Sequence, residues 1–198
     1  FTTVETKLGA LSALVNNAGI SGPRTKLIDL EASEMKRVFK VNLFGSFYCA
    51  KEAVQRMSLS NGGKGGAIVN ISSQAAEFGG NGLSPYAASK AAINNFTIAL
   101  SREVAIEGIR VNAVSPGATY TPILDDFYAT MDRERLAQLR VAAGGREGYP
   151  AEIAAPIVFL LSPGASWING VNLIVDGGAE AAIMLGKLPE RCEPISGS

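Results

Sequence analysis

The sequence predicts an α/β fold in which helices pack on both faces of a parallel sheet, giving three layers. Two observations support this fold class. Short apolar runs of strand length alternate with longer segments whose apolar side chains recur at helical spacing. Each apolar run also ends at a polar or glycine-rich turn. A chain of 198 residues with this pattern suits a single domain, residues 1–198.

The first half of the chain contains two predicted strands separated by a long predicted helix. Residues 11–15 form the first apolar run, which ends at the turn Asn16-Asn-Ala-Gly19. From about residue 31 to residue 57, apolar side chains recur every three or four positions, as expected of a helix in which Gly45 marks a kink or a close packing contact. A glycine-rich turn then leads into residues 67–71, the second apolar run.

The second half of the chain repeats this alternation. Residues 86–107 have an apolar side at helical spacing, and Gly108 ends the predicted helix. Residues 109–114 and 171–175 are apolar runs that predict two more strands, and residues 150–161 predict a short helix between them. Strands that alternate with helices in this way form a parallel sheet.

Two further segments fall outside this alternation. Residues 118–149 are the longest irregular segment and mix apolar side chains, a charged run and three glycines. A connection of this length often serves as a lid or binding loop; a surface helix with a solvated charged face is the alternative. We favour a substrate lid, because the segment leaves the ligand-binding end of the sheet. Residues 179–198 are predicted to form a C-terminal tail.

The composition excludes several classes of site and partner. The chain has no histidine, which excludes serine–histidine triads, histidine-containing metal sites and histidine proton shuttles. Its two cysteines, Cys49 and Cys192, lack metal-ligand spacing, so we expect reduced thiols in a cytoplasmic protein and no metal. The formal net charge of zero gives no footprint for nucleic acid, and no apolar run is long enough to span a membrane.

Tyr86 and Lys90 are the strongest candidates for proton chemistry in a chain without histidine. Their spacing places them on one face of a helix, about one turn apart. A nearby cation favours the phenolate: charges about 4 Å apart interact by roughly 4 kcal/mol at an effective dielectric near 20, enough to lower the phenol pKa by about 3. We therefore predict a general acid/base tuned toward neutral pH; an ordinary solvated helix face is the alternative.

The topology places this pair beside a ligand site. In open parallel sheets, ligands bind outside the carboxyl ends of the strands. Polar or glycine-rich segments follow three of the predicted strands, at Asn16-Asn-Ala-Gly19, Ser72-Ser73 and Ser115-Pro-Gly117. Tyr86 and Lys90 follow the second of these segments. The candidate site therefore lies at the carboxyl edge of the sheet.

Six motifs occur in order along the chain. They are Asn16-Asn-Ala-Gly19, Val41-Asn-Leu-Phe-Gly45, Ile68-Val-Asn-Ile-Ser-Ser73, Tyr86-x-x-x-Lys90, Ile109-Arg-Val-Asn112 with Ser115-Pro-Gly117, and Val175-Asp-Gly-Gly178. In this order and spacing, the chain from about residue 8 to 178 resembles the short-chain dehydrogenase/reductase family. The resemblance implies a Rossmann-like, doubly wound sheet. It also implies an oxidoreductase that uses NAD or NADP to transfer hydride to or from a small alcohol or carbonyl substrate.

The resemblance implies catalytic roles for four residues. Tyr86 would protonate the carbonyl oxygen or deprotonate the alcohol, and Lys90 would lower the phenol pKa and hydrogen-bond the nicotinamide ribose. Ser73 would hold the substrate oxygen; Ser72 is the alternative, but the thirteen-residue spacing to Tyr86 favours Ser73. Asn42 would support a water that links Lys90 to solvent, and it could at the same time satisfy backbone groups at a helix kink.

The resemblance places a cofactor-binding set at the same edge. The backbone after the first predicted strand would pass close to the adenosine ribose and its phosphate, since glycine allows a close approach. The segment after residues 109–114 would border the nicotinamide, and its threonines would donate to the carboxamide or the phosphates. The implied set is Asn17, Ala18, Gly19, Ile71, Tyr86, Lys90, Pro116, Gly117, Thr119 and Thr121.

One departure from the family pattern is the absence of a glycine-rich phosphate loop before residue 11. In the family this loop follows a strand that would lie beside residues 11–15. We therefore expect an upstream segment, truncated or disordered here, to supply the first strands and most of the dinucleotide affinity. The resemblance also implies a homotetramer or homodimer. The alternatives are a non-catalytic nucleotide-binding relative and an epimerase or dehydratase of the extended branch, which the short stretch after Lys90 disfavours.

Overall fold

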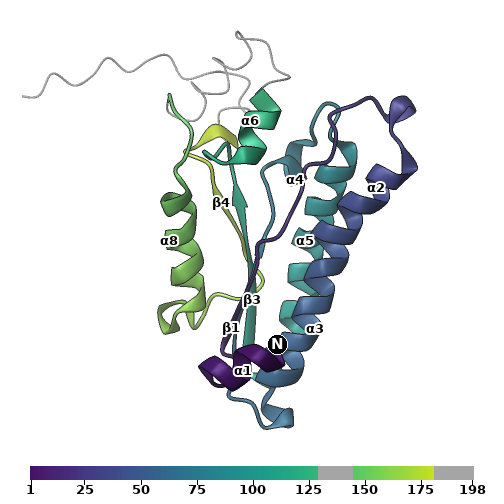
Figure 1. Cartoon of the computed structure of the whole chain (residues 1–198). Helices are drawn as coiled ribbons and strands as arrows, with labels where there is room; N and C mark the ends of the chain where they lie inside the picture. Colours follow the sequence, from purple (N-terminus) through teal and green to yellow (C-terminus); the bar gives the residue numbers. More distant parts are fainter. Residues whose placement is uncertain (129–144, 181–198) are drawn as a thin grey trace, which may run out of the picture.

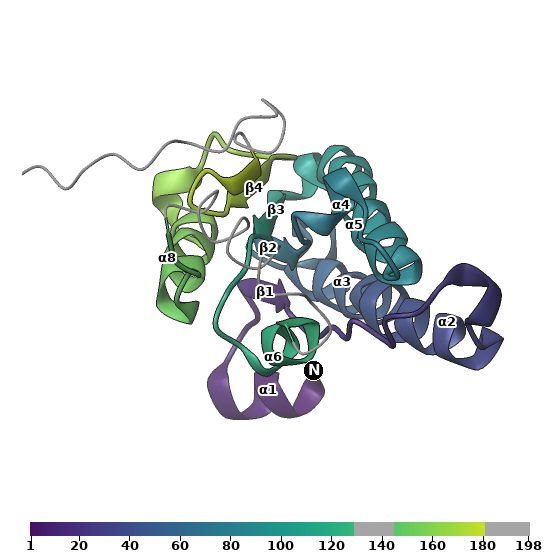
Figure 2. The same cartoon turned by 90° about the horizontal axis from the view of Figure 1, so that it is seen from above.

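Four parallel strands form one sheet in the order β1-β2-β3-β4 (Figure 2). The computed structural model describes residues 1–128 and 145–180. The strands in these ranges are β1 (Ala13–Asn16), β2 (Gly66–Ile71), β3 (Ile109–Pro116) and β4 (Asn172–Val175). Within the described residues β1 forms one edge of the sheet. Because every pair is parallel, all four carboxyl ends lie at the same edge.

Helices cover both faces of the sheet. The α-helices described are α1 (Thr2–Leu8), α2 (Ala32–Phe39), α3 (Gly45–Met57), α4 (Ala75–Phe78), α5 (Ser84–Glu103), α6 (Pro122–Tyr128) and α8 (Pro150–Leu161). Single 3-10 turns occur at Leu27–Asp29, Leu59–Asn61, Ala105–Glu107 and Pro163–Ala165. α3 and α5 pack on one face, and α8 packs on the other face against β2 and β3 (Figure 1). The three-layer, Rossmann-like prediction is confirmed.

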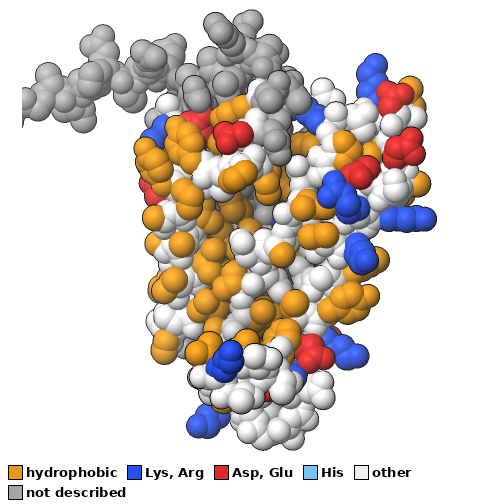
Figure 3. All heavy atoms as spheres, in the orientation of Figure 1, with side chains coloured by type: hydrophobic (Ala, Val, Ile, Leu, Met, Phe, Trp, Pro, Cys, Tyr) orange, Lys and Arg blue, Asp and Glu red, His pale blue; other side chains and the backbone are white. Residues whose placement is uncertain are grey.

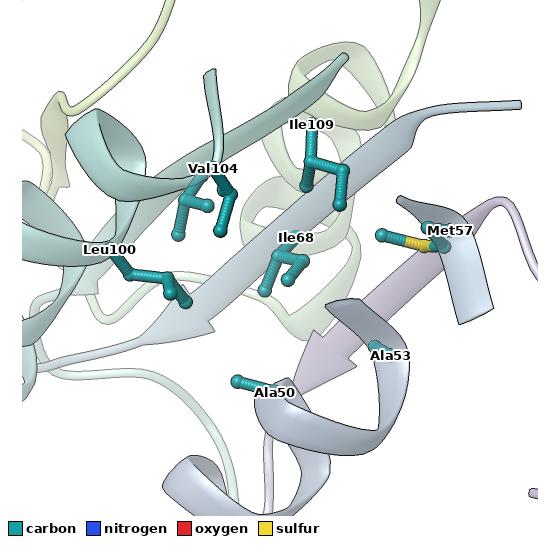
Figure 4. Packing of buried hydrophobic residues seen from close by; sticks show 8 residues of the cluster. Ala50, Ala53, Met57, Ile68, Leu100, Val104 and Ile109 are labelled. Carbon is teal, nitrogen blue, oxygen red and sulfur yellow. The ribbon is translucent and has the colours of Figure 1, made fainter. Parts of the chain in front are cut away.

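Two apolar clusters hold the layers together. The larger joins α3 and α5 to β2 and β3 (Figure 4), and its buried members are Ala50, Ala53, Met57, Ile68, Leu100, Val104, Ile109 and Val111. The second joins Val69 and Val114 of the sheet to Leu160 and Ala165. Since successive strand residues point to opposite faces, Ile68 and Val69 belong to different clusters. Burial on both faces explains why these strands are continuous apolar runs in the sequence.

The helix predicted from about residue 31 to 57 is interrupted by a π-helical segment, Lys40–Phe44. Gly45 donates its N–H to the carbonyl of Lys40, five residues back. This wider turn joins α2 to α3 and carries the buried side chain of Asn42. The irregularity predicted at Gly45 is therefore a π-bulge, a feature that is frequent at functional sites.

The boundaries of the other predicted strands and helices lie close to those expected, whereas α1 and α4 were not predicted from the sequence. α8 spans the predicted range residue for residue. α5 begins at Ser84 rather than Tyr86, with Pro85 in its first turn, and a 3-10 turn continues it to Gly108. Gly108 has a φ of 70°, the left-handed conformation that ends helices at low cost in glycine.

The predicted lid, residues 118–149, is only partly described. Its first part contains α6, and a short parallel bridge joins Thr119 to Gly148. Residues 129–144, and the predicted tail from residue 181 onward, lie outside the described residues. A lid function stays a prediction. Among the helices described, none combines the length and the apolar character needed to cross a bilayer.

Candidate active site

The residues predicted to do chemistry gather at the carboxyl edge of the sheet. Ser72 and Ser73 follow β2, and Tyr86 and Lys90 lie in the first two turns of α5. The turn after β1, which contains Gly19, leaves the sheet at the same edge. Figure 1 shows this end of the molecule at the top, beside α4 and α6.

Lys90 is fixed to the end of β2 by two hydrogen bonds. Its ammonium donates to the carbonyl of Ile71 at 2.7 Å, and its backbone carbonyl accepts from the Ser72 hydroxyl at 3.0 Å. The residue is 4% exposed. Loss of water around the ammonium lowers the pKa of Lys90 from 10.5 to about 8.

Tyr86 lies beside Lys90, but its pKa moves opposite to the prediction. The Nζ atom of Lys90 is 5.8 Å from the centroid of the Tyr86 ring. Burial of the phenol raises the pKa of Tyr86 above its ordinary value of 10.0, and a hydrogen bond with the Ser73 hydroxyl offsets part of that rise. The expected lowering of the phenol pKa by Lys90 is therefore wrong for this structure. The ammonium is bonded to the Ile71 carbonyl, and desolvation of the phenol dominates.

The two adjacent serines have different surroundings. Ser72 is buried; its N–H donates to the carbonyl of Val114 at 2.8 Å, and its hydroxyl is committed to Lys90. The Ser73 hydroxyl accepts from the N–H of Ala75 at 3.1 Å and hydrogen-bonds the Tyr86 phenol. Of the two serines, Ser73 is the one placed beside the phenol.

Asn42 connects the π-segment to the turn after β1 and to α5. Its amide nitrogen donates to the carbonyl of Ile20 at 2.9 Å and to the Ser89 hydroxyl at 3.0 Å, and its oxygen accepts from the N–H of Ile20 at 2.8 Å. Ser89 in turn donates to the carbonyl of Tyr86 at 2.7 Å. The sequence prediction missed Ser89. Its position about one helical turn after Tyr86 was the available signal.

Gly19 lies against the Lys90 ammonium. A Cβ atom built at this position would lie 3.3 Å from Lys90 Nζ and 3.5 Å from Asn42 Oδ1. Asn17 and Ala18, just before it, are exposed at the edge of the sheet. A side chain at residue 19 would crowd the ammonium. The open backbone and the ammonium donors together fit the ribose hydroxyls of a nucleotide cofactor.

The turn after β3 is closely packed on the end of β4. A Cβ at Gly117 would lie 2.7 Å from the Cβ of Asp176, so the two strand ends approach as closely as glycine allows. The Thr119 hydroxyl donates to the carbonyl of Gly117 at 3.0 Å, and the Thr121 hydroxyl donates to the carbonyl of Thr119 at 3.2 Å. The roles of Pro116 and of these residues toward a nicotinamide stay predictions.

The assembled groups suit proton transfer. A desolvated phenol that keeps its proton, a hydroxyl bonded to it and an ammonium of lowered pKa lie together at one edge of the sheet. Side chains positioned in this way act as general acids and bases. Over the residues that the structure describes, no three carboxylate, thiol or imidazole side chains are grouped to hold a metal ion.

Comparison with known proteins gives consistent matches. A family model described as enoyl-(acyl carrier protein) reductase matches residues 1–180. The uncharacterized oxidoreductase YgfF of Escherichia coli (strain K12) is 43% identical over 185 residues, covering 90% of this chain and 72% of that protein.

Two solved structures are also similar. The structure of levodione reductase has a TM-score of 0.82 and 32% identity, covering 91% of this chain and 71% of that one. A structure described as ribose-5-phosphate isomerase from Brucella melitensis 16M has a TM-score of 0.83 and 33% identity, covering 96% and 73%.

Proposed function

Because this chain belongs to the short-chain dehydrogenase/reductase family of NAD(P)-dependent oxidoreductases, we propose that it interconverts an alcohol and a carbonyl by hydride transfer, with Tyr86 as general acid/base. The observation that carries the proposal is the grouping of three side chains. The Tyr86 phenol is hydrogen-bonded to the Ser73 hydroxyl, and the Lys90 ammonium lies near its ring. Hydride transfer to a carbonyl carbon requires a proton for the oxygen, which a positioned phenol supplies.

The raised pKa of Tyr86 bears on the direction of proton transfer. At neutral pH the phenol keeps its proton, so Tyr86 can donate it to a carbonyl oxygen held by the Ser73 hydroxyl. Once Tyr86 has given up this proton, the hydrogen bond from the Ser73 hydroxyl stabilises the phenolate. Asn42 lies near Lys90, across Gly19, and would support the route by which a proton returns.

The carboxyl edge of the sheet would hold the cofactor. The bound nicotinamide supplies or accepts the hydride. Lys90 would donate to the ribose hydroxyls, and the open backbone at residues 17–19 would face the adenosine end. Ile71 fixes Lys90 through its carbonyl, and residues 116–121 would border the nicotinamide. Either NAD or NADP is compatible with these contacts.

The substitution Tyr86→Phe tests the proposal. It removes the acidic proton and keeps the ring, so turnover should fall at least about a hundredfold, the lower end of general acid/base contributions. Turnover is measured by the absorbance of reduced nicotinamide, with NADH or NADPH for a panel of ketones and aldehydes and with NAD⁺ or NADP⁺ for a panel of secondary alcohols.

Tyr48→Phe is the matched control, because Tyr48 lies on α3 and is 67% exposed. We expect this variant to turn over like the parent. Full turnover by Tyr86→Phe would exclude Tyr86 as the acid/base. Failure of the full-length parent to bind either nicotinamide cofactor would remove the oxidoreductase proposal altogether.

We further propose that the protein works as a homotetramer or homodimer in the cytoplasm. Phe47 of α3 is exposed and stacks on Phe96 of α5, with ring centroids 3.8 Å apart. On the other face of the sheet, Val158 of α8 and Trp167 are exposed, the latter by 99%. Figure 3 shows hydrophobic side chains gathered over α8. A second copy would cover such surfaces, and a purely monomeric sedimentation profile would contradict this.

A further inference from the structure

A hydrogen bond that crosses the end of β3 links the segments that follow β2 and β4. Gln74 comes directly after Ser73, and its side-chain amide donates to Oδ2 of Asp176 at 3.2 Å. β3 lies between β2 and β4 in the sheet, so this bond spans the strand between them. A bond of this kind, from an amide to a carboxylate, is stronger than one between neutral groups.

Both ends of this bond are held in place by the backbone. The N–H of Gln74 donates to the carbonyl of Pro116 at 3.0 Å. Asp176 accepts from the N–H of Gly178 at 2.8 Å and from the N–H of Glu180 at 2.7 Å. Gly117 packs directly on Asp176, as the 2.7 Å approach of a Cβ built at residue 117 shows. Three strand ends are thus tied into one unit.

Ser73 lies between this unit and Tyr86. The Ser73 hydroxyl accepts from the N–H of Ala75, and the phenol of Tyr86 bonds to that hydroxyl. Gln74 and Ala75, which directly follow Ser73, therefore help to determine where its hydroxyl lies. A displacement of this hydroxyl by about 1 Å would be enough to disturb the chemistry at Tyr86.

We propose that Gln74 and Asp176 are positioning residues for the active site, and that the bond between them holds the Ser73 hydroxyl against the Tyr86 phenol. The inference rests on the proposed function, because that function is what gives the Ser73–Tyr86 contact a catalytic role. It gives Asp176, in the Val175-Asp-Gly-Gly178 motif, a positioning role. This role is additional to those proposed for the active-site residues. Neither residue touches the reacting atoms in this role.

Titration of Tyr86 tests the proposal without substrate or cofactor. The chain is labelled with carbon-13 at the tyrosine ζ position, and the Tyr86 signal is assigned as the one lost in Tyr86→Phe. Because the Ser73 bond lowers the phenol pKa, Ser73→Ala should move the titration to higher pH. Gln74→Met, which keeps the length of the side chain but cannot donate, should move it in the same direction.

A double-mutant cycle tests whether Gln74 acts on the Tyr86 titration through Ser73 or independently of it. In the Ser73→Ala background, Gln74→Met should add no further shift, since both changes act through the same hydroxyl. Gln55→Met, at an exposed position on α3, should leave the titration unchanged. The proposal is overturned if Gln74→Met does not move the Tyr86 titration, if it adds a full shift in the Ser73→Ala background, or if Ser73→Ala itself has no effect.

A reversed bond provides the second variant. Gln74→Glu combined with Asp176→Asn exchanges donor and acceptor, keeps the bridge and gives up the bond from the N–H of Glu180. This double variant should titrate like the parent, whereas Gln74→Glu alone should not, because two carboxylates would then face each other. The proposal would be overturned if Tyr86 titrated in Gln74→Glu alone as it does in the parent, or if its titration were shifted in the reversed pair. Absence of turnover in the unaltered protein would contradict the proposed function, but it would not change the outcome of these titrations.

Discussion

At the scale of single residues, Lys90 shows how burial changes a side chain that the sequence singles out. The Tyr86-x-x-x-Lys90 spacing predicts a phenol and an ammonium on one helix face, and the structure places them there. The spacing does not reveal that the ammonium bonds to the Ile71 carbonyl, or that packing removes water from around both groups. These two facts set the direction in which each pKa moves, and both arise from the packing of α5 on the end of β2.

The stability of the fold should depend on pH through Lys90. The pKa of Lys90 falls from 10.5 to about 8 on folding, so below pH 8 the folded chain carries a destabilising buried charge. Between pH 8 and 10.5 the folded chain loses this proton while the unfolded chain keeps it. The free energy of unfolding should therefore rise by roughly 3 kcal/mol across that window from this group. Tyr86, with its raised pKa, acts in the opposite direction above pH 10.

Urea unfolding of the parent and of Lys90→Met over this pH range isolates the contribution. The variant should be more stable than the parent below pH 8, and the difference should shrink toward pH 10.5. Lys51→Met, at an exposed position on α3, should show the same dependence of the free energy of unfolding on pH as the parent. If Lys90→Met also shows that dependence, Lys90 does not carry the destabilising charge.

At the scale of elements, the start of α8 is stabilised by Glu152. Its carboxylate accepts two hydrogen bonds from the Arg146 guanidinium, at 2.7 and 2.8 Å, and a third from the N–H of Tyr149 at 2.7 Å. The third bond satisfies a backbone donor that precedes the helix, as in a capping box. The hydrogen bonds from Arg146 and Tyr149 lower the pKa of Glu152 to about 2.

Acid should therefore weaken the start of α8. Because the pKa of Glu152 is lower in the folded chain than in the unfolded chain, its stabilising effect is complete above pH 4.5 and is lost as the pH falls toward 2. Unfolding followed by circular dichroism should show a smaller acid-induced loss of stability for Glu152→Gln than for the parent. Glu103→Gln, at an exposed position on α5, is the control and should follow the parent. An acid response of Glu152→Gln equal to that of the parent would contradict this assignment.

The irregular elements were the least predictable from sequence. Apolar spacing is nearly the same in an α-helix and across a single π-turn, so the sequence could indicate an irregularity near Gly45 but not its kind. The π-turn at Lys40–Phe44 is fixed by the partners of Asn42, which come from Ile20 and Ser89, far away in the chain. Local patterns carry no information about such partners.

At the scale of the whole molecule, a buried polar network ties the sheet to α5. Asn70 of β2 is 0% exposed; its oxygen accepts from the amide of Asn16 at 2.8 Å, and its nitrogen donates to the Thr97 hydroxyl at 2.9 Å. Thr97 in turn donates to the carbonyl of Ile93 at 2.9 Å. This network runs from β1 through β2 into α5 of the helical layer. Its members satisfy one another where water is excluded.

Removal of the central amide should therefore be costly. Asn70→Ala breaks two buried hydrogen bonds and leaves the Asn16 amide with only its bond to the Ser46 carbonyl and the Thr97 hydroxyl with only its bond to the Ile93 carbonyl, so we expect the free energy of unfolding to fall by about 2–4 kcal/mol. Urea denaturation measures this loss through the transition midpoint at constant slope. Asn81→Ala, in the exposed loop before α5, serves as the control. A loss for Asn70→Ala no larger than that of the control would show that the network does not stabilise the fold.

The sequence alone determined the α/β class, the order of the strands and helices, and the edge of the sheet at which the site lies. Hydrophobic periodicity and turn residues are local signals, and parallel topology follows from their alternation. The tertiary structure decided which groups meet: Lys90 with the Ile71 carbonyl, Asn42 with Ser89, and Gln74 with Asp176 across β3. It also reversed the expected pKa shift of Tyr86, since desolvation depends on every atom packed around a group and no local pattern records that environment.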